Sequence, residues 1–467
     1  MKRFILLTAT LLALCSCTKY LDVKPRGYDI ASRVEHYEGM LYGSDMAFMN
    51  TSYAYRSMEC YTDTDGYANA YSQIGSYACN SFQWSREVYR EDQVCGEWNS
   101  FTTLLYHYNV IIAEVMEAEG GTEEDKRAIL SEARMLRAWC TFMMSFFFGE
   151  VPIIQKASTI ENSFPLSSIE EVKSFIIKEM SESVDYLRDV PEHYLRVFRP
   201  TGHGLYGKVL FMYGEYDKAC EELKKCLDLV KGQPSLGLID YRPLMDANGD
   251  IDYPVRADVN PERLFYAVDM PRLWSSVYAS MYNSLMFGVR NDLLELFFPD
   301  RRDCRLAFHS TVSNGTSAYK KYSSKEVYAA NMANIATNVG LDLAEVYTMY
   351  AECLARKGDT AGAAEILLEL RRHRMDEGHE AIPANVATKD DYVRFAFEER
   401  MREQFGFGTS WFDMKRLWDD PLFQYLKPLY VHTAGPETYT LTGDALYLAY
   451  PPTVMAWHPE YAKSNNN

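Results

Sequence analysis

Apolar residues return every three or four positions along most of the chain. The pattern is clearest over residues 104–119, 123–148 and 168–187, where it places the apolar side chains on one face of a helix. Gly149 and Pro152 follow the second segment and are expected to end it, because glycine favours the turn after a helix and proline cannot continue one. The periodicity predicts an all-α fold.

Two helical stretches share a common spacing when Gly214 is aligned with Gly358. Small residues where paired helices approach, glycine at the turn and leucine in the groove are typical of tetratricopeptide repeats, although a generic helical hairpin shows a similar pattern. We therefore expect tetratricopeptide-like helix pairs that form a right-handed scaffold, interrupted by long loop insertions. The matched positions are Gly207 with Ala351, Leu210 with Leu354, Ala219 with Ala363, and Leu223 with Leu367.

Four segments lack the helical period. Residues 61–89 are rich in Tyr, Ser, Gly, Asn and Asp, residues 231–260 hold Pro, Gly and Asp, and residues 274–286 are dense in aromatic side chains. Residues 433–448 hold short alternating runs, which predict at most a small β-hairpin. Long irregular segments on a rigid frame are where binding sites tend to lie.

The first 17 residues, MKRFILLTATLLALCSC, have the form of a lipoprotein signal peptide, with a basic start, an apolar run and a final cysteine. Cys17 is the expected lipidation site, because the competing Cys15 would place the bulky Leu14 at the cleavage position. An ordinary secreted protein is the alternative. No later segment approaches the roughly 20 apolar residues of a membrane span. The mature chain is expected to be anchored to a membrane by its acyl chains, without crossing it.

The net charge limits the kinds of partner that are expected. Loss of Lys2 and Arg3 with the signal peptide takes the net charge from −17 to −19, which argues against nucleic acid and against anionic lipid headgroups as partners.

Cysteines within helical segments are expected to be buried apolar residues, whereas one disulfide among those of the irregular segment is compatible with export. The first group is Cys140, Cys220, Cys226 and Cys353, and the second is Cys60, Cys79 and Cys95.

Several local motifs occur in a characteristic order over nearly the whole mature chain. They are CTKYLDVKPRG from Cys17, Trp98 with Tyr106 and Asn109, EARMLRA from Glu132 with FGEVP from Phe148, LAEVY from Leu343 with Ala351 and Glu352, ERMRE from Glu399, WFDMKR from Trp411, Pro451 with Pro452, and WHPEY from Trp457. Together they resemble the SusD/RagB family. One departure is the run GFGTS from Gly406, where the family usually has F-E-G-x-R, and it puts the usual packing of that corner in doubt.

The resemblance implies an all-α fold on tetratricopeptide-like helix pairs, anchored to the outer face of the outer membrane. It also implies a TonB-dependent SusC-like barrel as partner, to which the lipoprotein delivers a captured oligosaccharide or peptide. The expected division is a signal peptide (1–16), an N-terminal SusD-like helical half with a ligand loop at 61–90 (17–230), and a C-terminal SusD/RagB half that completes the same globular unit (231–467).

The sequence holds no catalytic fingerprint such as G-x-S-x-G, a P-loop or HExxH, and the protein is predicted not to be an enzyme. Carboxylate pairs such as Glu398/Glu399 and Glu345/Glu352 fall on helical segments, where a solvated or salt-bridged face is favoured over a pair of glycosidase acids.

One acidic run, Asp246-Ala247-Asn248-Gly249-Asp250-Ile251-Asp252, alternates oxygen-bearing side chains in a way that suits a structural Ca²⁺. It departs from an EF-hand loop at its sixth and twelfth positions, and an acidic turn in water is the alternative. The candidate metal ligands are Asp246, Asn248, Asp250 and Asp252, and no other cofactor is expected.

Sugars present C–H faces that pack on aromatic rings and hydroxyls that pair with carboxylates, amides and Arg. Two sets of residues supply this mixture, and the family places its ligand site on loops of the same two regions. Helical spacing would put the rings of the second set on one face. Burial in the core is the alternative for these rings, and it is also the alternative for Trp84. The candidate ligand-binding residues are Asp63, Asp65, Tyr67, Tyr71, Trp84 and Arg90 in the first set, and Trp274, Tyr278 and Tyr282 in the second. The tryptophans of the structural motifs (Trp98, Trp139, Trp411, Trp418 and Trp457) are expected in the core.

Two functions fit these observations, and a surface glycosidase or peptidase is the least favoured third. The first is a surface lipoprotein that captures a nutrient ligand, in particular an oligosaccharide. The alternative is a lipoprotein that binds a peptide or protein through the grooves of its helix pairs.

Overall fold

The computed structural model describes residues 31–42, 65–68, 83–87, 96–157, 164–190, 196–247, 251, 253–254, 260–269, 287–311, 316–319, 335–404, 410–434 and 437–464. Residues 34–42 are helical. The labelled α-helices that follow are α4 (Gly96–Glu114), α5 (Glu123–Phe148), α6 (Ile169–Ser183), α7 (Arg199–Met212), α8 (Tyr216–Val230), α11 (Asn291–Phe297), α13 (Leu343–Lys357), α14 (Thr360–Arg372), α15 (Lys389–Gln404), α16 (Ser410–Leu417) and α17 (Pro452–Trp457). The all-α class predicted from the sequence is confirmed.

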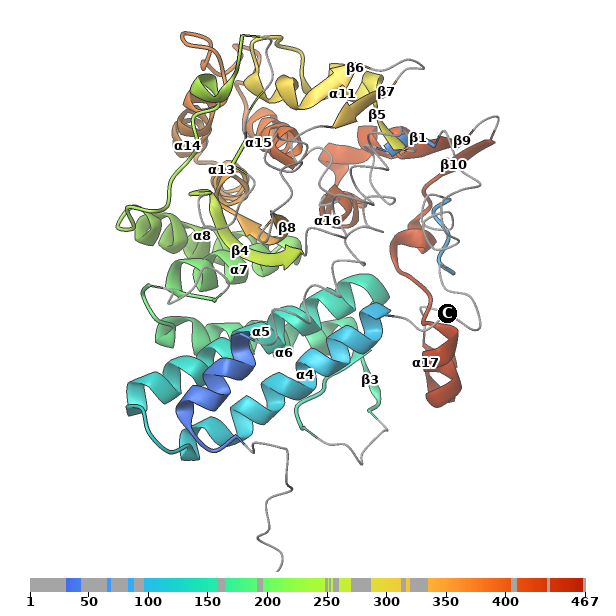
Figure 1. Ribbon diagram of the computed structural model, residues 1–467. Coiled ribbons are helices and arrows are strands. Elements are labelled where there is room, and N and C mark those ends of the chain that lie inside the picture. Colours follow the sequence, from blue (N-terminus) through green and yellow to red (C-terminus); the bar gives the residue numbers. More distant parts are fainter. Residues whose placement is uncertain are drawn as a thin grey trace, which may run out of the picture.

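The N-terminal helices have ends that the sequence specifies closely. Helix α5 occupies the predicted residues, with Thr122 and Asp125 forming a capping box at its start and Gly149 in a positive-φ conformation (φ 76°) after its end. The helix predicted over 104–119 begins earlier, at Gly96, and continues past Glu114 as the 3₁₀ turn η2 (Val115–Glu117). Helices α4, α5 and α6 pack side by side as one layer (Figure 1).

The two predicted helix pairs are present and lie against each other. Helices α7 and α8 turn at Gly214 (φ 74°), and α13 and α14 turn at Gly358 (φ 90°). A Cβ atom on Gly207 would lie 2.7 Å from Leu223 Cδ2, so only glycine permits this approach of α7 and α8. Helix α13 contacts α7 and α8 of the other pair, so the two copies are neighbours in space although they are far apart in sequence (Figure 1).

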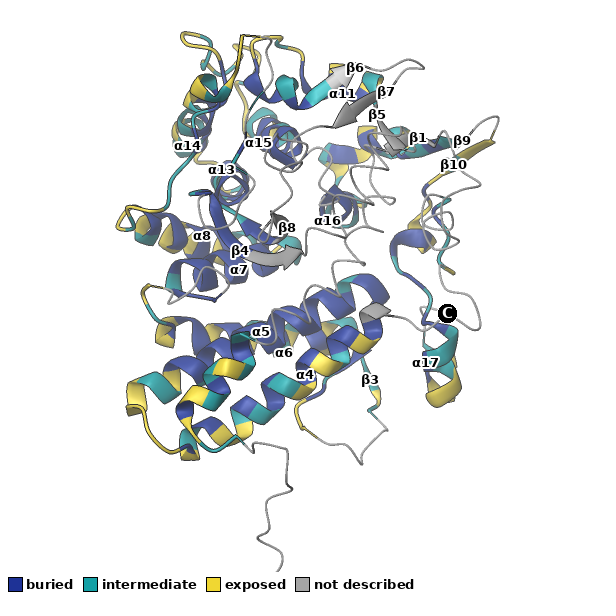
Figure 2. Ribbon diagram, viewed as in Figure 1, coloured by how far each residue is buried: buried dark blue, intermediate teal, exposed yellow. Residues whose placement is uncertain are grey.

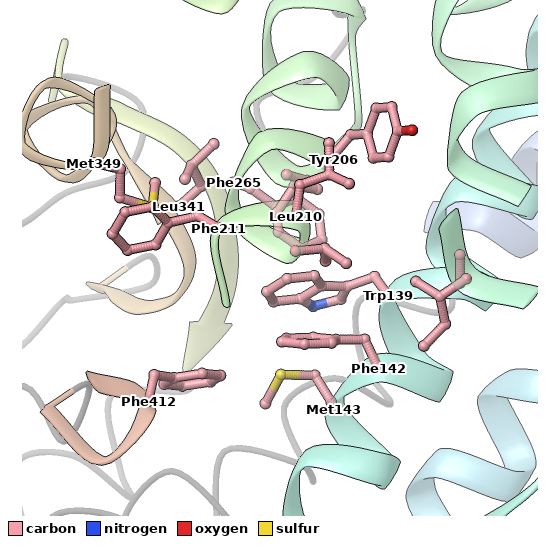
Figure 3. Packing of buried hydrophobic residues seen from close by; sticks show 14 of the residues in the cluster. Trp139, Phe142, Met143, Tyr206, Leu210, Phe211, Phe265, Leu341, Met349 and Phe412 are labelled. Atoms are coloured by element: carbon pink, nitrogen blue, oxygen red, sulfur yellow. The ribbon is translucent and has the colours of Figure 1, made fainter. Parts of the chain in front are cut away.

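A continuous hydrophobic core joins the N-terminal helices to the rest of the chain (Figure 2). Trp139 and Phe142 of α5 point toward Leu210 of α7 and Phe412 of α16 (Figure 3). The rings of Phe142 and Phe412 are stacked, with their centroids 6.3 Å apart. The helical cysteines predicted to be buried, Cys140, Cys220, Cys226 and Cys353, are buried and unpaired, whereas Cys60, Cys79 and Cys95 lie outside the described residues.

Ion pairs fill the interior around α13, α15 and α16. Glu399 is fully buried and lies 2.8 Å from Arg305, 2.6 Å from Arg371 and 2.9 Å from Arg402. Burial opposes ionisation of Glu399, but the charges of Arg305, Arg402 and Arg371 outweigh it and hold the pKa of this carboxyl well below its usual value. The carboxylate is therefore fixed as the centre of a salt-bridge cluster.

A second chain of ion pairs ties α13 to α15 and α16. Arg400 lies 2.9 Å from Glu345 and 2.6 Å from Asp413, and all three side chains are buried. Glu352 is bound in turn by Arg416 at 2.6 Å. The prediction that helical carboxylates form salt bridges is confirmed for Glu345, Glu352 and Glu399. Their ion pairs are buried, however, and do not lie on a solvated helix face.

The C-terminal segment is fastened to the N-terminal half. The Tyr450 hydroxyl donates to the Glu150 carbonyl at 2.6 Å, and the Tyr461 hydroxyl donates to the Phe164 carbonyl at 2.7 Å. Ser464 also donates to the Glu150 carboxylate at 2.6 Å. The last described residues thus hold the loop that follows α5.

The protein contains more β-structure than the predicted hairpin. The hairpin itself is confirmed as β9 (Val431–Ala434) with β10 (Glu437–Thr440). It forms part of a six-stranded sheet with β1 (Asp65–Ala68), β5 (Phe287–Arg290), β6 (His309–Thr311) and β7 (Thr316–Tyr319). Two further pairs join β2 (Val151–Pro152) to β3 (Leu166–Ser167) and β4 (Arg263–Asp269) to β8 (Ile335–Asp342). Most of these strands are short, and the pairs β1–β5 and β4–β8 join segments that are far apart in the sequence, so local alternation does not reveal them.

Short 3₁₀ turns link the helices and strands. They are η2, η3 (Val184–Tyr186), η4 (Arg242–Leu244), η6 (Cys304–Phe308), η7 (Pro421–Leu429), η8 (Gly443–Leu446) and η9 (Pro459–Lys463).

Candidate ligand-binding sheet

The six-stranded sheet gathers segments from three distant parts of the sequence. Its strand order is β10-β9-β1-β5-β7-β6. β1 pairs antiparallel with β5, with Asp65 opposite Val289 and Ala68 opposite Phe287, and parallel with β9, with Tyr67 opposite Thr433. The loop predicted at 61–90 is therefore joined through β1 to the strand that follows the second aromatic region.

The predicted ligand residues fall unevenly on the described chain. Asp65 and Tyr67 lie in β1, where only their backbone pairing is described, and Trp84 lies in the turn over residues 83–87. The others, Asp63, Tyr71, Arg90, Trp274, Tyr278 and Tyr282, lie outside the described residues, as does the lipidation site Cys17. The second aromatic set ends shortly before β5 in the sequence. The pairing of β1 with β5 thus brings together the strands that are continuous with the two predicted regions.

Trp84 is buried, which is the alternative that the sequence left open beside a role in ligand binding. Its side chain is only 4% exposed, and it stacks on His432 of β9 with ring centroids 4.1 Å apart. Trp411 of α16 stacks on it at 6.0 Å. Loop tryptophans are expected at the surface, but this one enters a core formed by the distant β9 and α16. The Trp84 ring is thereby part of this core, and its role in ligand binding stays a prediction.

The backbone at Trp84 is strained. Its φ is 59°, the left-handed region that glycine favours, and no other non-glycine residue of the described chain has a positive φ. Such a conformation costs a bulky residue on the order of 1–3 kcal/mol and persists only where its surroundings enforce it. Strained residues of this kind cluster at functional sites, so the turn over residues 83–87 is a functional candidate on backbone grounds as well.

The 83–87 turn is held by the C-terminal segment. Arg86 Nε donates to the Tyr447 carbonyl at 3.2 Å, and the Ala449 amide donates to the Arg86 carbonyl at 2.9 Å. Beside it, the Lys415 ammonium donates to the Phe146 carbonyl and lies 3.7 Å from the centre of the Tyr447 ring. Burial lowers the pKa of Lys415 well below its usual value, because its surroundings are aromatic.

The tryptophans expected in the core are divided by the structure. Trp98, Trp139 and Trp411 are buried as predicted, and Trp418 is half-buried. Trp457 is 80% exposed, so its assignment to the core is wrong. It is the last residue of the short helix α17, whose neighbouring turn is held through Tyr461 instead.

The predicted calcium loop is only partly described. Asp246 is exposed, while Asn248, Asp250 and Asp252 lie outside the described residues. An antiparallel bridge between Met245 and Ile251 closes the base of this loop. No cluster of three or more His, Cys, Asp or Glu side chains suited to a metal occurs among the residues with described positions. Calcium binding stays a prediction.

The structure thus defines a helical scaffold that carries a mixed sheet built from its insertions. The chain matches a family model described as starch-binding and associating with the outer membrane over residues 19–212, and a model of the SusD family over residues 306–461. The protein belongs to the SusD/RagB family. No curated protein matches its sequence.

Solved structures share the fold at low sequence identity. A SusD superfamily protein from Bacteroides vulgatus is 18% identical, with a TM-score of 0.72 over 92% of this chain and 98% of its own. A SusD homologue from Bacteroides thetaiotaomicron is 15% identical, with a TM-score of 0.71 over 91% and 96%. A SusD-like carbohydrate-binding protein from Bacteroides vulgatus is 17% identical, with a TM-score of 0.64 over 82% and 83%.

Proposed function

We propose that this protein is an outer-membrane surface lipoprotein that binds an oligosaccharide at the six-stranded sheet and delivers it to a TonB-dependent SusC-like transporter. The observation that carries the proposal is the pairing of β1 with β5, which joins the two regions where the sequence concentrates aromatic and polar side chains. Family membership and the starch-binding description of the N-terminal family model support the ligand class.

Binding rather than catalysis is the proposed activity. A glycosidase needs one carboxyl group that donates a proton and a second that acts as base or nucleophile. Glu399 and Glu345 are buried against guanidinium or ammonium groups that hold their pKa values low, so neither can serve as an acid near neutral pH.

The buried helix pairs favour this function over a peptide scaffold. A tetratricopeptide groove binds its partner with the inner faces of its helices. Here α13 is covered by α8, α14 and α15, and its inward positions Ala351 and Leu354 are buried. The described helix pairs therefore bury their apolar faces in the protein core.

The test is a binding screen of protein that lacks residues 1–17 against a glycan array and a peptide pool. We expect an oligosaccharide to bind and Tyr67→Ala to weaken that binding, since Tyr67 lies in β1. Tyr186→Ala is the matched control, because Tyr186 is an exposed tyrosine outside the six-stranded sheet, in the 3₁₀ turn after α6. Binding of peptides alone, or turnover of the bound glycan, would overturn the proposal.

Membrane attachment is tested separately. We propose that acyl chains on Cys17 anchor the protein facing outward. None of the helices that the structure describes has the length and apolar character to cross a bilayer. Cys17→Ser should release the protein from the outer membrane, and protease added to intact cells should digest the wild-type protein. Retention of the Cys17→Ser protein in the membrane would contradict the anchor.

A further inference from the structure

A groove of about 660 Å³ runs along one face of α15, apart from the six-stranded sheet. Its floor is formed by Asp391, Arg394, Glu398 and Arg402, which follow one another at helical spacing. The walls come from the turn after α11 and from the loop between α14 and α15. The volume lies within the range of roughly 300–1,000 Å³ that is typical of small-molecule sites.

The charges that line the groove balance one another. Arg302 lies 2.7 Å from Asp300, and Arg402 lies 3.2 Å from Glu398. Arg394 lies 3.9 Å from Asp391. Three cations and three carboxylates line the groove, so the formal charges of the lining sum to zero and give an ionic ligand no net attraction.

The paired groups keep hydrogen-bonding capacity toward the groove. The side chains of Arg394, Asp391 and Glu398 remain 40%, 31% and 34% exposed. Asn385, in the loop between α14 and α15, is exposed and adds an amide to the lining. Guanidinium, carboxylate and amide groups on two sides of one groove offer donors and acceptors for neighbouring hydroxyls.

The floor is fixed, and the walls are partly apolar. Arg402 is buried and its Nε also donates to the Phe297 carbonyl, which holds the guanidinium in place. Partial burial of Glu398 raises the pKa of its carboxyl, although the charge of Arg402 opposes the rise. Pro299, Pro383 and Val386 supply apolar surface against which C–H groups pack.

We propose that the α15 groove is a second ligand site, which takes a neutral mono- or disaccharide. Balanced charges exclude a preference for an ion, while fixed polar groups and apolar walls match the two kinds of surface of a sugar. The inference rests on the proposed function only for the choice of sugar as ligand class, since the groove shares no described residue with the sheet.

The test is calorimetric titration of the mature chain with maltose, cellobiose, lactose and mannobiose, and with phosphate and glucuronate as anionic probes. We expect at least one neutral disaccharide to bind, and Asn385→Ala with Arg394→Ala to weaken it at least about fivefold, as for the loss of one or two hydrogen bonds to charged groups. Arg372→Ala is the control, because Arg372 is an exposed arginine of α14 that pairs with the nearby Glu369 and does not line the groove. Melting curves establish whether the variants fold. If Arg394→Ala does not fold, the single loop variant Asn385→Ala is used for the comparison with the wild type.

The inference fails if none of the four disaccharides binds, if the double variant binds as the wild type does, or if only the anionic probes bind. Failure of the groove is separate from failure of the sheet. An oligosaccharide whose binding is weakened by Tyr67→Ala but not by the groove variants would retain the proposed function and remove the second site.

Discussion

Glu399→Gln tests whether the buried charge cluster stabilises the fold. The substitution keeps the shape of the side chain but removes the charge that faces Arg305, Arg371 and Arg402 at 2.6–2.9 Å. Arg305 retains Asp303 and Glu403, and Arg371 retains backbone carbonyls, so each guanidinium loses only part of its compensation. Breaking a buried ion pair by removing one partner costs about 3–5 kcal/mol.

The expected shift in melting temperature follows from the size of the protein. With an unfolding entropy of about 2.1 cal/mol/K per residue, a chain of about 450 residues gains roughly 0.95 kcal/mol/K on unfolding. A loss of about 4 kcal/mol therefore lowers Tm by about 4 °C. Differential scanning calorimetry at pH 7 measures this shift directly.

Glu369→Gln is the matched control, because Glu369 belongs to an exposed ion pair with Arg372 on α14. Exposed pairs contribute about 0–1 kcal/mol, so the control should shift Tm by about 1 °C or less. If Glu399→Gln melts together with the control, the three guanidinium groups do not depend on Glu399 and the account of the cluster is wrong.

Three further predictions concern stability. The carboxyl groups of Glu399, Glu345 and Asp413 have lower pKa values in the folded protein, because the effect of neighbouring cations outweighs the opposing effect of burial. Their stabilisation is therefore complete above about pH 4.5 and is lost as the pH falls from there toward the folded-state pKa values. Tm measured between pH 6 and pH 3 should therefore fall with acidification, and a flat profile would contradict this. Gly207→Ala should cost about 1–3 kcal/mol by overpacking against Leu223, whereas Gly237→Ala, with open space around it, should cost little in the same urea titration. Thr122→Ala should cost about 1 kcal/mol by removing the cap of α5, and an unchanged urea midpoint would refute the role of that cap.

Local signals predicted the scaffold well. The C-terminal end of α5 follows from Gly149, and the helix pairs follow from glycines at 214 and 358 and from small residues at the helix contact. Each of these signals acts within one helix or one turn, so a single sequence carries it.

The sheet and the burial of Trp84 could not be predicted in this way. β1 and β5 are four residues each and pair across more than 200 positions, so neither has enough alternation to indicate a strand. Trp84 lies in a polar, irregular segment, and only the arrival of His432 and Trp411 buries it. The candidate site is therefore specified by tertiary pairing, while the sequence indicates only which regions supply it.

The attachment of residues 450–464 to the loop after α5 bears on how the chain matures. The loop that follows α5 receives these hydrogen bonds from residues that are made long after it. The N-terminal half therefore cannot complete its packing until residues 450–464 have been synthesised and have folded back onto it. A chain truncated before residue 450 would lack this closure, and the loop after α5 would be more open to proteolysis.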